Sequence, residues 1–382
     1  MTPKHILMSA IRAQICGLPS VPFGELSEED RRVLYAMAKE QDMAHILAAE
    51  FGKQGLLSPT DEISQKLRKQ QLIAIYRYEQ LNYELNEICL ALEQAEIPFL
   101  PLKGSVIRTY YPEPWMRTSC DVDVLVHKEN LDAACKALET ALHYEVKYDC
   151  SHDVSLYSPS GVHVELHFDL VEEGRAGSSQ AILKDAWVHA SVKEGCRFHY
   201  EFDDALYYLY HIAHMAKHLE DGGCGIRPFV DLWILEHQVP HDDTRRNALL
   251  EEASLLRFAD TARTLSEVWF GMAEHTELTE SLEHFLLSSG IYGSLEGRVA
   301  VQQEKHGGKL AYLLNRVFLP YGELKIQYPV LEKHPCLTPI MEVRRWGRLL
   351  FRGGAKRSAK VLQMNAKTTS KNGTGLLEKL GL

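Results

Sequence analysis

The sequence lacks the features of membrane-spanning, exported or disulfide-bonded proteins. No apolar run approaches the roughly 18 residues that a membrane-spanning helix needs, and Arg12 and Gln14 interrupt any apolar core of an N-terminal signal peptide. The eight cysteines include no CxxC pair, so a zinc site or a disulfide framework is disfavoured and reduced thiols are expected. We therefore predict a cytoplasmic protein with no membrane span.

Positive charge is scarce except near the C-terminus. The formal charge of the 382-residue chain is −10, yet residues 343–382 carry ten Lys or Arg and one acid, a local +9 that leaves −19 for the rest. An acidic body disfavours broad nucleic-acid binding, whereas the basic tail leaves contact with RNA or an anionic lipid open beside the commoner outcome, a solvated extension. The composition, 45% hydrophobic and 25% charged, is that of a globular protein with two or three domains.

Hydrophobic periodicity divides the chain into four regions. Residues 1–95 are predicted to be helical, with a capping box at Ser27 and a long helix from about Asp61 to Gln94. Residues 96–195 contain alternating, strand-like segments and form an α/β core, and helical periodicity returns over residues 196–352. Residues 353–382 form a basic tail that is expected to be flexible. The predicted fold class is therefore α+β.

The core is predicted to be one mixed sheet with a few helices. A short apolar strand ends at about Leu102, residues 121–126 form a second strand, and residues 128–142 form a helix. Two further strands follow near residues 144–148 and 153–157. The turn residues 158–161 then pair the last of these strands, as a hairpin, with a strand over residues 162–170.

Two carboxylates share one face of the second predicted strand. Asp121 and Asp123 are two residues apart, so both project to the same side, and hard divalent cations prefer such oxygen ligands. Glu165 shares a face with His163 and His167 on a later strand, and three carboxylates converge if the two strands are neighbours. A half-exposed edge strand and a hydrated outer face of a sheet are alternative explanations of these patterns.

A glycine turn precedes the aspartate strand. Lys103-Gly104-Ser105 follows a strand and begins a helix, so backbone N–H groups and the positive helix end are placed to bind phosphate, and Ser105 adds a hydroxyl. Taken alone, the tripeptide is more often an ordinary turn between a strand and a helix. Its proximity to two aspartates favours a phosphate-binding role.

The combination of turn and carboxylates resembles a known family. The run LKGSVIRTYYPEPWMRTSCDVDVLV, from Leu102 to Val126, resembles the signature of the uncharacterised nucleotidyltransferase family within the DNA polymerase beta superfamily. VELHFDL at residues 164–170 resembles the later acidic strand of that family, and a histidine-containing helix followed by an Asp-Leu element at Asp231 extends the likeness over about residues 30–350. The resemblance implies a polymerase-beta-like nucleotidyltransferase core, flanked by helical N-terminal and C-terminal regions.

The resemblance also implies a reaction: transfer of an NMP group from an NTP to an acceptor hydroxyl, with release of pyrophosphate. Two Mg²⁺ ions, or Mn²⁺ in their place, would be held by Asp121, Asp123 and Glu165. The nucleotide would be bound by Lys103, Gly104, Ser105 and Arg117. Arg117 fits a surface ion pair equally well. Candidates for the wall of the acceptor site are His167, His211, His214, His218, Arg227 and Asp231.

Other functions fit the same residues. The acceptor can be a small molecule, a sugar, a peptide, a protein or, as in toxin-like enzymes, a tRNA. A catalytically silent nucleotide-binding module is an alternative that three mutually repelling carboxylates disfavour. A metal-dependent phosphohydrolase is another, because His211, His214 and His218 share one helix face, although packed or solvated histidines explain that spacing equally well.

Overall fold

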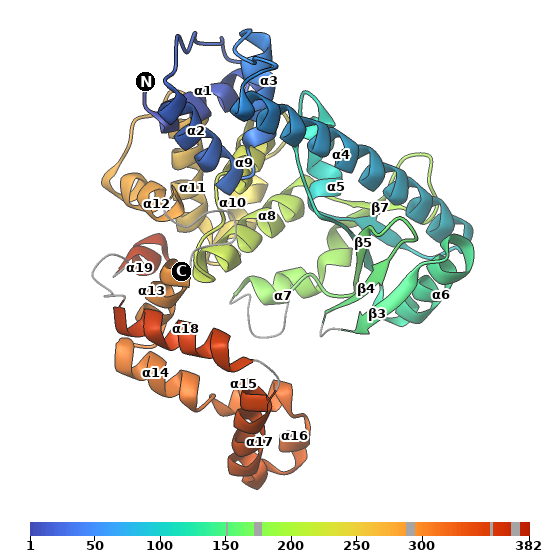
Figure 1. Cartoon of the computed structure of the whole chain (residues 1–382). Coiled ribbons are helices and arrows are strands. Elements are labelled where there is room, and N and C mark those ends of the chain that lie inside the picture. The colour runs from blue at the N-terminus through green and yellow to red at the C-terminus, as the bar shows by residue number, and fades with distance from the viewer. Residues whose placement is uncertain (150–151, 172–177, 288–294, 352–353, 368–374) are drawn as a thin grey trace. The chain divides into compact units, whose positions relative to one another are not determined.

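A five-stranded mixed sheet lies among helices in the N-terminal two thirds of the chain (Figure 1). The structure is a computed structural model, and it describes residues 1–149, 152–171, 178–287, 295–351, 354–367 and 375–382. Helices precede the sheet and follow it in the sequence, and the predicted α+β class is confirmed. None of the helices in these ranges is both long and apolar enough to span a membrane.

Four helices precede the sheet, and three of them begin at a side-chain cap, formed by Thr2, Ser27 and Asp61. The Ser27 hydroxyl accepts a hydrogen bond from the Asp30 N–H (3.1 Å) at the start of α2, and Asp61 Oδ2 accepts one from the Ser64 N–H (2.7 Å) at the start of α4. The predicted capping residue at position 27 and the predicted long helix are thus confirmed. These helices are α1 (Pro3–Gln14), α2 (Glu28–Glu40), α3 (Ala44–Lys53) and α4 (Glu62–Gln94).

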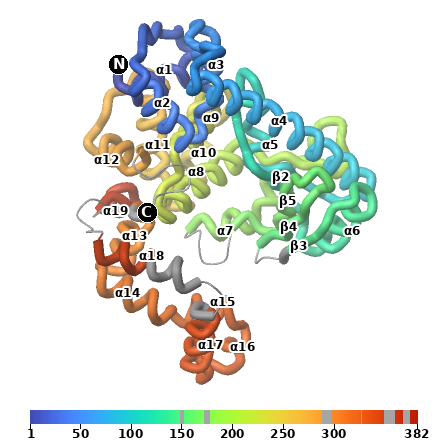
Figure 2. The backbone as a smooth tube through the Cα atoms, in the orientation of Figure 1, coloured from blue at the N-terminus to red at the C-terminus, as the bar shows by residue number. Residues whose placement is uncertain are grey.

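The sheet has the spatial order β1-β2-β5-β4-β3, and Figure 2 labels its last four strands in that order. Strands β2 and β5 are parallel, whereas every other neighbouring pair is antiparallel. The predicted hairpin between the strands before and after residues 158–161 is confirmed. The elements are β1 (Phe99–Pro101), α5 (Gly104–Ile107), β2 (Asp121–Val126), α6 (Leu131–Leu142), β3 (Glu145–Asp149), β4 (Asp153–Tyr157) and β5 (His163–His167).

One face of this sheet packs against helices, which leaves the other face for polar side chains. The side chains of Val122, Val124 and Val126 of β2 are buried in one hydrophobic cluster with Leu92 of α4 and Leu138 of α6. The alternation of a strand then directs the odd-numbered residues of β2 away from this core. The face opposite α4 and α6 therefore carries the aspartates.

The chain continues through short strands and many helices. The next elements are α7 (Ser179–Lys184), β6 (Ala190–Val192), β7 (Tyr200–Phe202), α8 (Asp204–Glu220), α9 (Arg227–His237), α10 (Asp243–Glu252), α11 (Leu256–Phe270) and α12 (Glu277–Leu287). The last are α13 (Leu295–Lys305), α14 (Lys309–Val317), α15 (Tyr321–Gln327), α16 (Val330–Lys333), α17 (Thr338–Phe351), α18 (Gly354–Lys367) and α19 (Leu376–Leu380).

Two compact units divide these elements. One comprises residues 1–217 and 226–279, and the other comprises residues 218–225 and 280–382. The second unit has small cores of its own, one around Val299, Tyr312 and Val361. Within the segment expected to be a flexible tail, residues 354–367 and 376–380 are helical, while residues 353 and 368–374 lie outside the described ranges. The four-region division stays a prediction.

Candidate active site

Parallel pairing of β2 with β5 brings the three carboxylates together. In this register Asp121 lies opposite His163, and Asp123 lies opposite Glu165. Ligand atoms of Asp121, His163 and Glu165 lie within 4.8 Å of one another, and those of Asp123, Glu165 and His167 do so as well. Glu165 belongs to both groups, so it connects the two aspartates. The two strands are neighbours, so the three carboxylates converge as the sequence predicts for that case.

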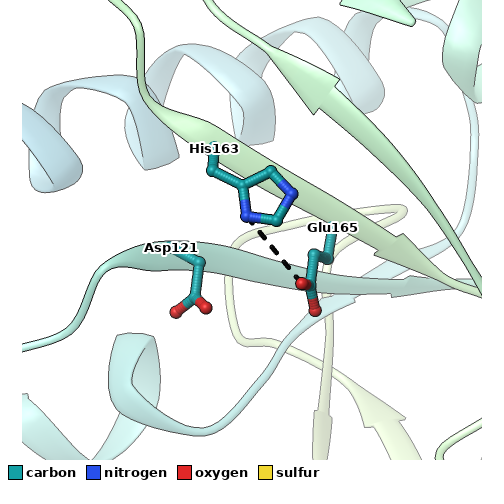
Figure 3. Close-up of side chains that lie close together, drawn as sticks. All are labelled: Asp121, His163 and Glu165. Atoms are coloured by element: carbon teal, nitrogen blue, oxygen red, sulfur yellow. Dashed lines mark ion pairs between the residues drawn. The ribbon is translucent and has the colours of Figure 1, made fainter. Parts of the chain in front are cut away.

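The end of the site at Asp121, whose side chains Figure 3 draws, is partly exposed to solvent. Asp121, His163 and Glu165 are each half-buried. The Nδ1 atom of His163 lies 3.8 Å from Glu165 Oε1, and its Nε2 atom lies 3.1 Å from Ser155 Oγ. Burial, and then repulsion from Asp123, raise the pKa of Asp121 above its ordinary value. Among the described residues, no Lys or Arg forms an ion pair with Asp121 that would offset this effect.

The end at Asp123 is closed and neutralised. Asp123 is only 5% exposed, and its Oδ1 accepts hydrogen bonds from Lys103 Nζ and from His167 Nε2, each at 2.9 Å. The same His167 nitrogen lies 3.2 Å from Glu165 Oε2. Burial would raise the pKa of Asp123, but the Lys103 ammonium and His167 hold it far below its usual range. Burial likewise opposes charge on His167, whose pKa is nevertheless raised by its bonds to the two carboxylates.

The turn that supplies Lys103 has a strained backbone. Lys103 has φ 46° and ψ −119°, a conformation that glycine favours and that costs other residues about 1–3 kcal/mol. Two bonds hold the turn in place, because the Leu102 N–H donates to Asp123 O (3.0 Å) and the Tyr207 hydroxyl donates to Lys103 O (2.8 Å). The residue with the strained backbone, Lys103, is therefore also the one whose ammonium group contacts Asp123.

Most backbone N–H groups of this turn are already bonded. The N–H of Ser105 donates to Leu102 O, and those of the next two residues donate to Lys103 O, all at 3.1 Å. Helix α5 has only four residues, so its dipole is small. Within residues 102–107, only the N–H groups of Lys103 and Gly104 are without a backbone acceptor, so the expected binding of phosphate by this turn stays a prediction that can involve only these two groups.

Two guanidinium groups lie beside Gly104 instead. A Cβ atom at Gly104 would lie 3.2 Å from Arg117 Nη1 and 3.4 Å from Arg108 Nη2. Arg108 is 5% exposed and donates from Nε to Gly104 O (2.6 Å) and from Nη2 to Ser119 Oγ (2.6 Å). Burial, and then repulsion from Arg117, lower the pKa of Arg108 to about 10. Among the described residues no carboxylate forms an ion pair with Arg108, which the sequence patterns did not single out.

Arg117 is held by a buried ion pair rather than by a surface pair. Its Nε lies 2.9 Å and 3.0 Å from the two Asp231 oxygens, and the Tyr111 hydroxyl donates to Asp231 Oδ1 (2.6 Å). Asp231 is 2% exposed; burial opposes its charge, but Arg117 lowers its pKa below the ordinary value. Asp231, expected on the acceptor wall, is thus the partner that orients Arg117. Arg227 lies 3.2 Å from Asp42 Oδ2.

The histidines of α8 do not join the carboxylates. His211 Nε2 lies 3.0 Å from Pro228 O, and burial lowers the pKa of this histidine. His214 lies next to the ring of Tyr210, with ring centroids 6.4 Å apart. His218 lies in the last turn of the helix and belongs to the second compact unit. In the described part of the chain, none of the three is grouped with other metal-ligating side chains.

The fold and the site together define an α+β protein with a carboxylate cluster on a mixed sheet, next to a cationic glycine turn. Residues 27–271, well over half of the chain, match the family described as uncharacterised nucleotidyltransferase, and the chain belongs to this family. The resemblance noted in the sequence is thereby confirmed, although the match ends well before residue 350. No curated protein and no solved structure gives a significant match.

Proposed function

We propose that this protein transfers a nucleoside monophosphate from an NTP to an acceptor hydroxyl and releases pyrophosphate. In this reaction the hydroxyl oxygen forms a bond to the α-phosphorus, and the bond between that phosphorus and the oxygen bridging to the β-phosphorus breaks. The hydroxyl proton passes to the Glu165 carboxylate and then to solvent. The observation that carries the proposal is the pairing of Asp123 with Glu165 beside the glycine turn, in a chain of this family.

The carboxylate cluster supports a role for a divalent cation. Oxygen atoms of Asp121, Asp123 and Glu165 are the ligands that Mg²⁺ or Mn²⁺ prefers, and their mutual repulsion is relieved by positive charge. When bound, such a cation neutralises phosphate oxygens and lowers the pKa of the attacking hydroxyl. The side chains themselves bring acceptor and α-phosphate to one place, which supplies a large part of such a rate enhancement.

The arginines support binding of the triphosphate. The guanidinium groups of Arg108 and Arg117 both lie close to Gly104, which has no side chain to separate them from a ligand, and we infer that a phosphate group contacts both. Asp231 and Tyr111 fix the direction of Arg117, whereas Arg108 has no acidic partner of its own among the described residues and gains one when an anion binds. We assign Ser105 and Lys103 to the same subsite, Ser105 through its hydroxyl.

The acceptor is proposed to be a hydroxyl on a small molecule, sugar, peptide or protein. Nucleic acid is not favoured as the acceptor, because the chain as a whole carries a formal charge of −10. His167 and the α8 residue His211 stay proposals for the acceptor side, since His167 contacts two of the three carboxylates and His211 packs close to the Asp231 network.

The test is release of pyrophosphate from ATP, GTP, CTP or UTP, with Mg²⁺ or Mn²⁺ and a cell extract as the source of acceptor, followed by mass spectrometry of the modified component. We expect Asp121→Asn to lower turnover by at least about a hundredfold while the circular dichroism spectrum is unchanged. Asp185→Asn, which changes an exposed aspartate outside the cluster, is the matched control and should retain full activity. Retained turnover in Asp121→Asn would falsify the assignment.

A further inference from the structure

The two ends of the carboxylate cluster are unlike as cation sites. Lys103 Nζ and His167 Nε2 both lie 2.9 Å from the same Asp123 oxygen. A cation at this oxygen would have to share it with the Lys103 ammonium group or displace that group, and a cation at the other carboxylate oxygen of Asp123 would lie close to the same ammonium. The bonds at Leu102 and Tyr207 hold the turn that carries Lys103 beside Asp123. Although ligand atoms of Asp123, Glu165 and His167 lie within 4.8 Å of one another, this end therefore fits a second metal ion less well than the end at Asp121.

The end at Asp121 fits a cation well. Asp121, His163 and Glu165 extend from adjacent strands, and their ligand atoms lie within 4.8 Å of one another (Figure 3). No Lys or Arg in the described residues forms an ion pair with Asp121 or Glu165, so no ammonium or guanidinium group is in direct contact with either carboxylate. The position is also half-buried rather than closed, which leaves it accessible to an ion from solvent.

His163 is oriented as a ligand by a residue outside the cluster. Its Nε2 lies 3.1 Å from Ser155 Oγ on β4, and its ring stacks on Tyr157 with a centroid distance of 4.9 Å. In the tautomer that carries its proton on Nε2, His163 donates to the Ser155 hydroxyl, and the lone pair of Nδ1 then lies on the side of Glu165. Metal-binding histidines characteristically use their second nitrogen in this way.

We propose that the site binds one divalent cation through Asp121, His163 and Glu165, and that Lys103 supplies the second positive charge, at Asp123. This inference rests on the proposed function and replaces the two-ion arrangement expected from the sequence. A set of two carboxylates and one imidazole suits Mn²⁺ and other first-row transition metals better than Mg²⁺, which is ligated almost entirely by oxygen. The protein is therefore expected to prefer Mn²⁺ over Mg²⁺.

The experiment is a titration of the full-length protein with Mn²⁺ alone, followed by electron paramagnetic resonance of the free and the bound ion. We expect one Mn²⁺ per chain, nitrogen coupling in the spin-echo modulation of the bound ion, and displacement by Mg²⁺ only at an excess of at least about tenfold. His163→Ala should weaken binding by at least about tenfold and abolish the nitrogen coupling. The matched control His284→Ala, an exposed histidine of α12, should change neither.

Lys103→Met tests the second half of the proposal. Without the ammonium, the Asp123 carboxylate becomes available, and we expect the variant to bind two Mn²⁺ per chain. Two ions on the unaltered protein, or nitrogen coupling that persists in His163→Ala, would overturn the inference. If a variant fails to fold, the nitrogen coupling of the unaltered protein still tests whether a histidine binds the ion. The titration contains no nucleotide, so its result does not depend on turnover. One bound ion in the titration, together with no pyrophosphate release in the separate assay with NTPs, would contradict the proposed function alone.

Discussion

Asp121 and Asp123 are the same residue type on the same face of one strand, yet they differ in almost every physical property. Asp121 is half-buried, and burial with repulsion from its neighbour raises its pKa. Asp123 is more deeply buried, but Lys103 and His167 contact it and its pKa is strongly lowered. Burial acts on both in the same direction, so counter-charge decides the difference. The end at Asp123 carries its own counter-charge, and the end at Asp121 is the one at which we propose a cation.

The largest expected effect tests whether a neighbouring cation also keeps a third buried carboxylate, Asp231, charged. Asp231 is buried against Arg117, and Asp231→Asn would leave that guanidinium without its partner. We expect a loss of about 3–4 kcal/mol in the free energy of unfolding, measured by urea denaturation at pH 7. Tyr111→Phe, which removes one neutral donor to Asp231, should cost only about 1 kcal/mol.

The pH dependence of the same variant gives a second check. The folded-state pKa of Asp231 is lowered, so its contribution to stability is complete above the unfolded-state pKa of about 3.9 and is lost as the pH falls through the lower folded value. The difference in stability between the unaltered protein and Asp231→Asn should therefore shrink in acid below about pH 4. A difference that stays constant down to about pH 2 would contradict a charged, paired Asp231.

A direct comparison of the two aspartates comes next in size. Asp123→Asn removes the negative charge that pairs with the Lys103 ammonium, whose side chain is three quarters buried. We expect the free energy of unfolding to fall by about 2 kcal/mol. Asp121→Asn removes a charge that the fold disfavours, so stability should be unchanged or slightly increased. Chemical denaturation of both variants without divalent cations makes the comparison. Equal losses would show that counter-charge does not distinguish the two ends.

The smallest effect concerns the strain in the turn. Lys103→Gly and Lys103→Met both remove the ammonium, but only glycine adopts φ 46° without strain, so Lys103→Gly should be the more stable variant by about 1 kcal/mol. Glu96→Gly is the control for strain alone, since Glu96 has φ 57° and only an exposed ion pair. Its unfolding free energy should rise by a few tenths of a kcal/mol or more. Equal stability of the two Lys103 variants would show that the backbone conformation of residue 103 is not strained.

Much of the fold could be predicted because its signals are local. The capping residue Ser27, the long helix α4 and the alternation of β2 all lie within short stretches of sequence, and each is predictable close to its observed bounds. The phosphate-binding role of the turn at Gly104 is predicted from its backbone, whereas the structure uses most of those N–H groups internally. A tripeptide pattern does not specify which backbone N–H groups form hydrogen bonds within the turn.

The residues that the sequence patterns missed are those whose surroundings come from distant segments. Arg108 lies inside the run from Leu102 to Val126, but the motif does not single it out. Only the tertiary structure places this guanidinium, which has no carboxylate ion-pair partner in the described chain, beside Gly104 and Arg117. The strand pattern predicts a hydrated surface residue at His163 as readily as a ligand, and the contact with Ser155 on a neighbouring strand is what orients it. Both observations depend on packing between elements.

By itself, the sequence determined which side chains share a face: Asp121 with Asp123, and His163 with Glu165 and His167, because the two-residue period of a strand is a local property. Only the tertiary structure decided that β2 and β5 are parallel neighbours, that Asp123 faces Glu165, and that Arg117 finds Asp231 more than a hundred residues away. Such pairings close long loops, and the energy that selects them comes from packing one whole face of the sheet against α4 and α6.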